Sequence, residues 1–206
     1  MTPDRPLRAD AARNADRILR AAREVYAALG PDAPMDVVAS SAGVGERTLY
    51  RRFPSKGDLI RAALDQSIAE NLSPVIERAL RRDDPLRGLT DLISAATSLG
   101  AQEHNLLAAA RKAGVLGDVS SPLDGALKDL TRRAQRAGLI RADLVDDDLP
   151  RIIAMLNSVL WTMDPDSDGW RRYVGLMLDA LTTTKGRRLV PAPALNYAPR
   201  LADWPL

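Results

Sequence analysis

The chain has 206 residues, of which 46% are hydrophobic and 27% charged, and its formal net charge is +2 at pH 7. This composition is typical of a soluble globular protein, and a net charge this small says little about partners unless charges are unbalanced locally. Cysteine is absent, which excludes disulfides, thiolate metal sites and cysteine nucleophiles and fits a reducing cytoplasm. The longest apolar stretch, residues 152–163, is too short to span a bilayer, and the N-terminus has no apolar core of a secretory signal. We therefore expect no membrane segment and no signal peptide.

The N-terminal third of the chain predicts three helices in quick succession. Apolar residues recur at helical spacing over residues 18–29, and a Gly-Pro pair ends that run. A short segment over residues 34–43 ends at a glycine, and another over residues 46–53 is broken by the proline that follows it. Ser55 then predicts the N-cap of a longer helix.

Helical periodicity continues through most of the remaining chain. Pro74 is expected to kink or end the fourth helix. Residues 185–206 contain four prolines and little periodicity, which predicts an irregular tail. No alternating strand pattern is present, so the fold class is all-α, with about nine helices. The later helices are expected over residues 56–72, 85–99, 103–114, 121–138, 147–163 and 168–181, and the domains over residues 1–55, 56–184 and 185–206.

The second and third segments have the spacing of a helix-turn-helix. Ala39 supplies the small residue that the crossing of the two helices needs, and Gly43, four residues later, can adopt the left-handed backbone of the turn. Val44 and Leu49 are expected to fill the wedge between the helices, with Phe53 closing its end. A helical hairpin of another kind would need only the apolar residues, so the combination predicts a DNA-binding motif.

The outward face of the third segment carries groups that phosphate oxygens attract. From Arg47 through Lys56 there are four basic residues and no acidic one, whereas the whole chain has 29 basic and 27 acidic residues. At the start of the following helix, Lys56 adds its charge to exposed backbone N–H groups, which favours an anion there. This local imbalance predicts a phosphate-facing surface. Its side chains are those of Arg47, Thr48, Tyr50, Arg51, Arg52 and Lys56.

Residues 34–60, PMDVVASSAGVGERTLYRRFPSKGDLI, resemble the N-terminal DNA-binding segment of the TetR family of bacterial transcriptional regulators. The resemblance covers about residues 10–60 and is most specific between Gly43 and Lys56. It implies a three-helix domain whose third helix enters the major groove. The family often has threonine at the start of the second helix, where this chain has Pro34, so one hydroxyl contact to phosphate is missing. By this similarity Gly45 allows close approach to DNA, Glu46, Arg47 and Thr48 face base edges, and Tyr50, Arg51, Arg52 and Lys56 contact phosphates.

Basic residues also precede the first predicted helix. Arg5, Arg8 and Arg13 belong either to an arm that reaches toward DNA or to a disordered segment. The second interpretation is the more ordinary one.

One recognition helix binds too weakly for gene control, so we expect a homodimer that places two of them about 34 Å apart on a palindromic operator. The helix predicted at 149–163 is apolar on most sides and has more surface to bury than one small domain covers. In the family that the chain resembles, the last two long helices form a four-helix interface with those of the partner. Ordinary core packing is the alternative. The expected interface residues are Ile152, Leu156, Leu160, Trp170, Tyr173 and Met177, with Trp161 as a further anchor.

The resemblance also implies a ligand cavity among the middle helices. We expect a small, largely apolar molecule that binds better to the conformer with misplaced recognition helices and so releases a repressor from its operator. Core packing is again the alternative for each residue taken singly. The expected lining residues are Leu64, Ile68, Leu92, Ile93, His104, Leu107, Met155 and Trp161.

Catalytic and metal chemistry has no visible basis in the sequence. His104 is the single histidine and has no partner at metal-ligand or general-base spacing. No phosphate-binding glycine loop and no nucleophile–base set is present, so we expect no enzymatic activity, metal or cofactor. An all-α enzyme or carrier would leave the basic cluster from Arg47 to Lys56 unexplained. The alternative function is a helical interaction module, or a non-specific DNA binder without ligand response.

Overall fold

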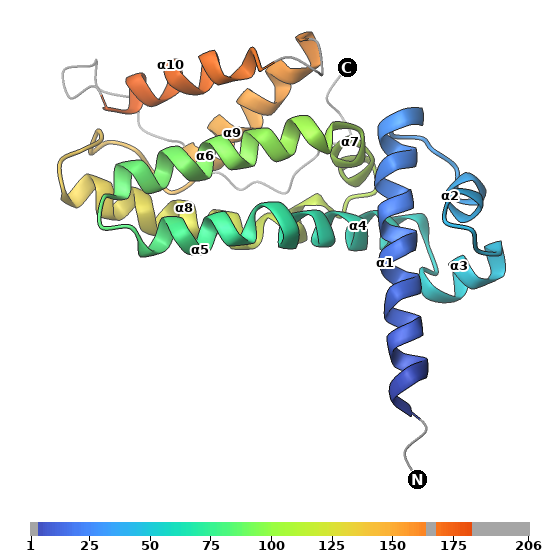
Figure 1. The fold of residues 1–206 in the computed structure, drawn as a ribbon. Helices are drawn as coiled ribbons and strands as arrows, with labels where there is room; N and C mark the ends of the chain where they lie inside the picture. Colours follow the sequence, from blue (N-terminus) through green and yellow to red (C-terminus); the bar gives the residue numbers. More distant parts are fainter. Residues whose placement is uncertain (1–3, 164–167, 183–206) are drawn as a thin grey trace. The chain divides into compact units, whose positions relative to one another are not determined.

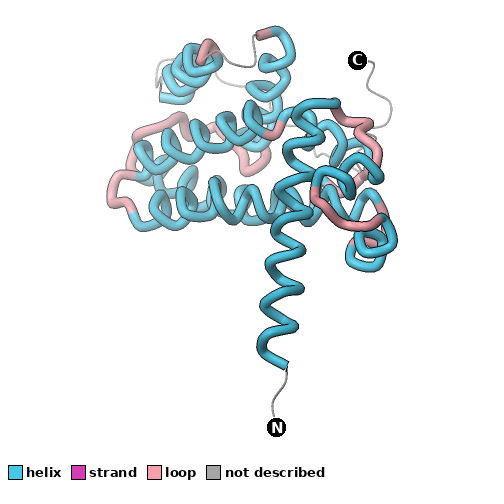
Figure 2. The backbone as a smooth tube through the Cα atoms, turned by 45° about the vertical axis from the view of Figure 1, so that its right-hand side comes forward, coloured by secondary structure: helices cyan, strands magenta, loops and turns pink. Residues whose placement is uncertain are grey.

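The computed structural model describes residues 4–163 and 168–182, with side chains described except at 4–12, 118–121 and 161. These residues form ten α-helices and one 3₁₀ turn and contain no strand, which confirms the predicted all-α fold (Figure 1). Figure 2 shows the same helices joined by short loops. The elements are α1 (Asp4–Leu29), α2 (Met35–Ser41), α3 (Glu46–Arg52), α4 (Lys56–Asn71), α5 (Ser73–Arg81), α6 (Pro85–Gln102), α7 (His104–Lys112), α8 (Leu116–Arg136), α9 (Asp148–Val159), η1 (Leu160–Thr162) and α10 (Trp170–Thr182).

The described helices divide between two compact units. Unit 1 contains residues 4–67 and 103–119, and unit 2 contains residues 68–102 and 120–182. The chain therefore changes unit within α4, at the junction of α6 and α7, and again within α8. The predicted boundary at residue 55 is a functional division and stays a prediction, and the predicted tail lies outside the described residues.

Unit 1 is built on the apolar stripe of α1. This helix packs on α2 and α7, and α2 packs on α3. Ile18, Tyr26, Val38 and Leu49 are fully buried, and burying a large apolar side chain contributes about 1.5–3 kcal/mol. The three N-terminal helices are thus held together by side chains that the helical spacing predicts as core.

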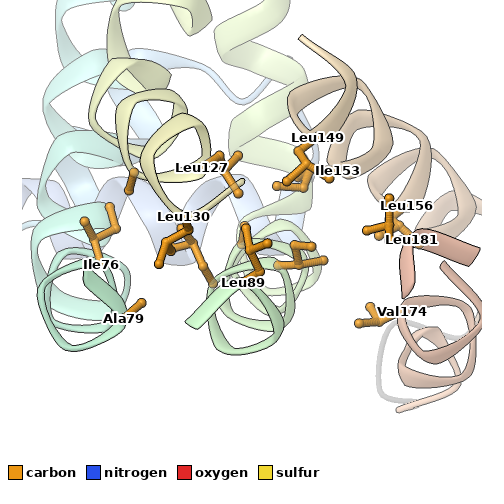
Figure 3. Packing of buried hydrophobic residues seen from close by; sticks show 14 of the residues in the cluster. Ile76, Ala79, Leu89, Leu127, Leu130, Leu149, Ile153, Leu156, Val174 and Leu181 are labelled. Atoms are coloured by element: carbon orange, nitrogen blue, oxygen red, sulfur yellow. The ribbon is translucent and has the colours of Figure 1, made fainter. Parts of the chain in front are cut away.

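In unit 2, α6 packs on α5, α9 and α10. The approach of α5 to α6 depends on Gly88, because a Cβ at that position would lie 2.9 Å from the Ala79 carbonyl oxygen and 3.0 Å from Leu130 Cδ2. Figure 3 shows Leu130 and Leu127 of α8 beside the residues of α5 and α6, with Leu149 and Ile153 of α9 to the right of these two leucines. Figure 3 also places Leu156 beside Val174 and Leu181 of α10.

The structure differs from the expected helices in three places. α5, from Ser73 to Arg81, was not predicted as a helix of its own: Pro74 lies in its first turn, where the missing N–H costs nothing, and α4 ends just before it. α1 begins at Asp4, so the backbone ahead of Arg13 is helical rather than disordered, and an arm that reaches DNA stays a prediction. α8 begins at Leu116 and contains Pro122 within it, ahead of the start expected from the periodicity.

Candidate DNA-binding interface

The turn between α2 and α3 has the predicted left-handed glycine. Gly43 has φ of +62°. The Gly43 N–H donates to the Ser40 carbonyl at 3.0 Å and the Val44 N–H to the Ala39 carbonyl at 3.0 Å, which is the hydrogen-bond pattern of a Schellman motif. Ala39 is 1% exposed and Leu49 is fully buried. The helix-turn-helix predicted from these spacings is therefore formed.

One face of α3 is buried and the opposite face is open. Leu49 is buried within the helix, and Phe53 at its C-cap is 7% exposed. Thr48 is half-buried. The remaining predicted contact residues of the turn and helix are exposed, namely Gly45, Glu46, Arg47, Tyr50, Arg51 and Arg52. Their placement suits a surface that faces a partner, and their contacts with DNA stay a prediction.

The first turn of α4 is closed by its own side chains. The Ser55 N–H and Oγ–H both donate to Asp58 Oδ2, at 3.0 and 2.7 Å, and the Asp58 N–H donates to Ser55 Oγ at 3.1 Å. This reciprocal pair confirms Ser55 as the N-cap. Because the Asp58 carboxylate already occupies this end of the helix, an external anion there is less favoured than the sequence suggested.

Lys56 is packed against α1. Its Nζ lies 5.6 Å from the centroid of the Tyr26 ring, and the side chain is half-buried. Burial raises the pKa of Tyr26 to about 12, so the phenol stays neutral and its ring face attracts the ammonium group. A phosphate contact from Lys56, as predicted, would therefore come from a side chain that α1 already holds in place.

An open hollow of about 810 Å³ lies beside α3 and is bounded on its other side by α1. We call it the cationic hollow, because four of its lining residues are the arginines Arg13, Arg17, Arg51 and Arg52. Asn14 and Thr48 also line it. Sequence reasoning did not single out Arg17 or Asn14, although the spacing of four residues between Arg13 and Arg17 already places both on one helix face.

A second polar cluster in unit 1 is buried. Glu103, at the N-cap of α7, is 5% exposed. Its Oε1 accepts from Arg23 Nε of α1 at 2.6 Å and from Ser67 Oγ of α4 at 2.7 Å. Arg23 Nη2 also lies 2.6 Å from the same oxygen. One carboxylate thus joins three helices of unit 1, a junction that no local sequence pattern predicts.

The residues predicted to line a ligand cavity fall in both units. Leu64 is fully buried, and His104 and Leu107 are half-buried in unit 1, where burial lowers the pKa of His104. In unit 2, Leu92 and Ile93 are fully buried and Ile68 is partly buried. The inward placement predicted for Met155 is wrong: this side chain is 59% exposed, because it lies opposite the buried stripe of α9. The side chain of Trp161 lies outside the described residues, and the cavity itself stays a prediction.

Half of the residues predicted for a dimer interface are buried in their own chain. Leu156, Leu160 and Trp170 belong to the core of unit 2, so they pack within their own chain, and their role as partner contacts stays a prediction. Ile152 and Met177 are partly buried. The large apolar side chains that α9 and α10 leave exposed are instead Met155, Tyr173 and Leu176, at 59%, 41% and 53%. The spacing of apolar residues in the sequence does not show which of two apolar faces of a helix meets the rest of the chain.

The described part of the chain contains neither a metal-binding group of side chains nor a membrane-spanning helix. It contains no group of three or more His, Cys, Asp or Glu side chains arranged to hold a metal ion. Among the described helices, none combines the length and apolarity needed to cross a membrane.

Comparison with known proteins identifies this architecture. Residues 18–63 match the family described as bacterial regulatory proteins of the tetR family. No curated protein matches the chain significantly. Among solved structures, the chain is similar to a TetR transcriptional regulator from Streptomyces coelicolor, with 32% identity, a TM-score of 0.57, and 82% of this chain and 99% of that one covered. It is also similar to a TetR transcription regulatory protein from Mycobacterium vanbaalenii, with 30% identity, a TM-score of 0.56, and coverage of 86% and 100%.

A further likeness concerns the fold alone. The transcriptional regulator FadR from Bacillus subtilis, solved in complex with stearoyl-CoA, has 19% identity and a TM-score of 0.68, with 81% of this chain and 97% of that one covered. The helix-turn-helix, the all-α fold and the identities above lead to one conclusion. The chain belongs to the TetR family of bacterial transcriptional regulators.

Proposed function

We propose that the protein is a homodimeric, sequence-specific repressor that a small ligand releases from a palindromic operator. The observation that carries the DNA-binding part is the exposed face of α3. Arg47, Arg51 and Arg52 are exposed on a helix whose opposite residue, Leu49, is fully buried. A helix anchored in this way presents a rigid row of guanidinium groups, which suits bidentate contacts with phosphates and guanine edges.

Within this proposal the residues divide by role. Glu46, Arg47 and Thr48, in the first turn of α3, would face base edges, and Gly45 would let the backbone approach. Tyr50, Arg51, Arg52 and Lys56 would contact phosphates. Side chains that meet phosphates fix the register of the protein on the duplex, whereas those that meet base edges supply the sequence preference.

Dimerisation is proposed through α9 and α10. The three exposed apolar side chains Met155, Tyr173 and Leu176 lie on these two adjacent helices. A recognition helix needs a second copy to span two half-sites, and exposed large apolar residues on neighbouring helices favour a partner surface. Ile152 and Met177, partly buried, would border it.

Release from DNA by a ligand is the most specific part of the proposal. The FadR structure from Bacillus subtilis, which holds stearoyl-CoA, has a similar fold, and this supports an apolar ligand for the present chain. The lining residues expected from the sequence, Met155 excepted, stay a prediction. The ligand would act by binding more tightly to a conformer whose recognition helices cannot span both half-sites. We propose that the protein has no enzymatic activity.

The test is a selection followed by a titration. Purified protein is used to enrich duplexes from a randomised pool, and the enriched duplex and a scrambled one are then titrated by fluorescence anisotropy at two salt concentrations. We expect preference for the enriched duplex, a palindromic consensus, and loss of affinity at higher salt. Arg51→Ala should weaken binding, whereas Arg111→Ala, at an exposed position on α7 of the same unit, should not. No enrichment, together with equal binding of all duplexes, would contradict the proposal.

A further inference from the structure

We propose that the cationic hollow is a second binding site for the phosphodiester backbone of DNA, in which Arg13 and Arg17 of α1 act beside the contacts made by α3. This inference rests on the proposed function, because it assigns a further surface to the same DNA partner. It extends the interface from the helix-turn-helix to α1, whose side chains before Ile18 lie ahead of the matched family segment of residues 18–63.

The charge of the hollow points to an anion. Arg13 and Arg17 of α1 and Arg51 and Arg52 of α3 all line it, and among the side chains that the structure describes no acidic one does. The contact that Arg17 makes with Asn14, from Nη2 to the amide Oδ1 at 2.9 Å, is with a neutral group and so leaves the guanidinium charge uncompensated. Some exposed arginines elsewhere lie beside carboxylates, as Arg132 does beside Asp146 at 2.7 Å and Arg82, at the C-cap of α5, beside Asp91 at 2.8 Å.

The spacing within α1 supports the same conclusion. Arg13 and Arg17 are four residues apart and share one face of the helix, an arrangement that destabilises an isolated helix through like-charge repulsion. One phosphate can therefore lie near both side chains. Guanidinium groups match phosphate oxygens in geometry as well as charge.

The position of the hollow selects DNA over a free anion. Thr48 and Arg51, which line the hollow, are also residues proposed to contact DNA from α3. A duplex lying along α3 would therefore also lie against the opening of the hollow. Its four arginines come from two helices across an open space of about 810 Å³, which suits an extended polyanion better than a single phosphate.

The experiment measures the salt dependence of DNA binding for variants of α1. Arg17→Ala, Arg17→Gln and Arg13→Ala are compared with Arg20→Ala, which removes an exposed arginine of the same helix that does not line the hollow. Each lost phosphate contact should make the negative slope of log K against log salt concentration shallower by about 0.9. We expect Arg17→Ala and Arg17→Gln to weaken binding roughly tenfold on enriched and scrambled duplexes alike, because phosphate contacts carry no sequence information. Arg20→Ala should keep the wild-type slope.

Two results would overturn the inference while leaving the proposed function intact. One is an unchanged slope and affinity in both Arg17 variants when Arg51→Ala lowers them. The other is stabilisation of the DNA-free protein by inorganic pyrophosphate, measured as a rise in Tm, that is lost in Arg17→Ala although DNA binding is not; this result would assign the hollow to a free anion. Failure of the wild-type protein to bind any duplex contradicts the proposed function itself, and the inference fails with it.

Discussion

At the scale of single residues, two positions in unit 1 have a larger effect on local structure than their neighbours do. Gly43 sets the angle at which α3 leaves α2, because its φ of +62° is a conformation that other residues rarely adopt. Glu103 accepts hydrogen bonds from both Arg23 and Ser67. The first acts through the backbone and the second through a buried charge, so their substitution tests different physical effects.

Gly43→Ala should destabilise the protein by about 1–2 kcal/mol, the cost of a left-handed backbone at a residue with a Cβ. No atom lies within 4 Å of a Cβ built at Gly43, so a steric clash would not contribute. The control is Gly125→Ala, in the interior of α8 with open space around it, which should stabilise by about 0.5–1 kcal/mol. Urea unfolding followed by circular dichroism measures both, and equal effects of the two substitutions would contradict the reasoning.

Glu103→Ala should destabilise unit 1 by about 3 kcal/mol, because it leaves the partly buried guanidinium of Arg23 without its carboxylate. Replacing both partners, in Arg23→Met with Glu103→Leu, should recover much of this loss, since the isolated charge is then gone. The single variants Glu103→Leu and Arg23→Met and the double variant form a thermodynamic cycle measured by denaturant unfolding. Additive effects would show that the ion pair contributes no coupling.

At the scale of elements, close packing in unit 2 depends on where a glycine falls in a helix. α5 approaches α6 at Gly88, where a Cβ would lie 2.9 Å from a backbone oxygen, that of Ala79. At Gly100, further along α6, the nearest atoms belong to the side chain of Asn157. A backbone atom cannot move without the helix, whereas a side-chain amide can rotate.

Gly88→Ala should therefore destabilise unit 2 by about 1–3 kcal/mol, the usual cost of overpacking a core. Gly100→Ala should cost less, because the Asn157 side chain can turn away and the alanine also favours the helix. Thermal unfolding of both variants tests the order. A larger effect at Gly100 than at Gly88 would mean that Asn157 is fixed in place.

At the scale of the whole molecule, gene control requires two recognition helices, and the exposed apolar side chains of α9 and α10 are the surface proposed to join two copies. Leu176 is 53% exposed and Tyr173 is 41% exposed on α10. They are three residues apart and therefore share one face of that helix. An apolar surface of this kind is favourable to bury against a second copy and unfavourable to leave in water.

Leu176→Glu should raise the dissociation constant of the dimer at least tenfold, about 1.4 kcal/mol, because it buries a charge in the proposed interface. Leu139→Glu, which changes a leucine that is 37% exposed and lies outside α9 and α10, is the matched control and should leave the dimer intact. Sedimentation velocity over a range of concentrations measures both. A wild-type protein that stays monomeric at every concentration would contradict this part of the proposal.

Local sequence patterns predict the all-α class, the helix-turn-helix with its left-handed Gly43, the N-cap at Ser55 and the exposed basic face of α3. Each of these depends on neighbours within about ten residues, where helical spacing, glycine and capping chemistry act directly. The sequence also predicted apolar faces for α9 and α10, but placed Met155 inward and Leu156 and Trp170 at an interface.

Only the tertiary structure decided those assignments, because a helix that is apolar on most sides gives no local sign of which face the rest of the chain covers. The same holds for the separate helix α5 behind Pro74, for the junction of Arg23, Ser67 and Glu103, whose members lie up to 80 residues apart, and for the hollow that brings Arg17 to Arg51. Contacts between distant segments depend on how helices pack, and packing is a property of the whole set of side chains.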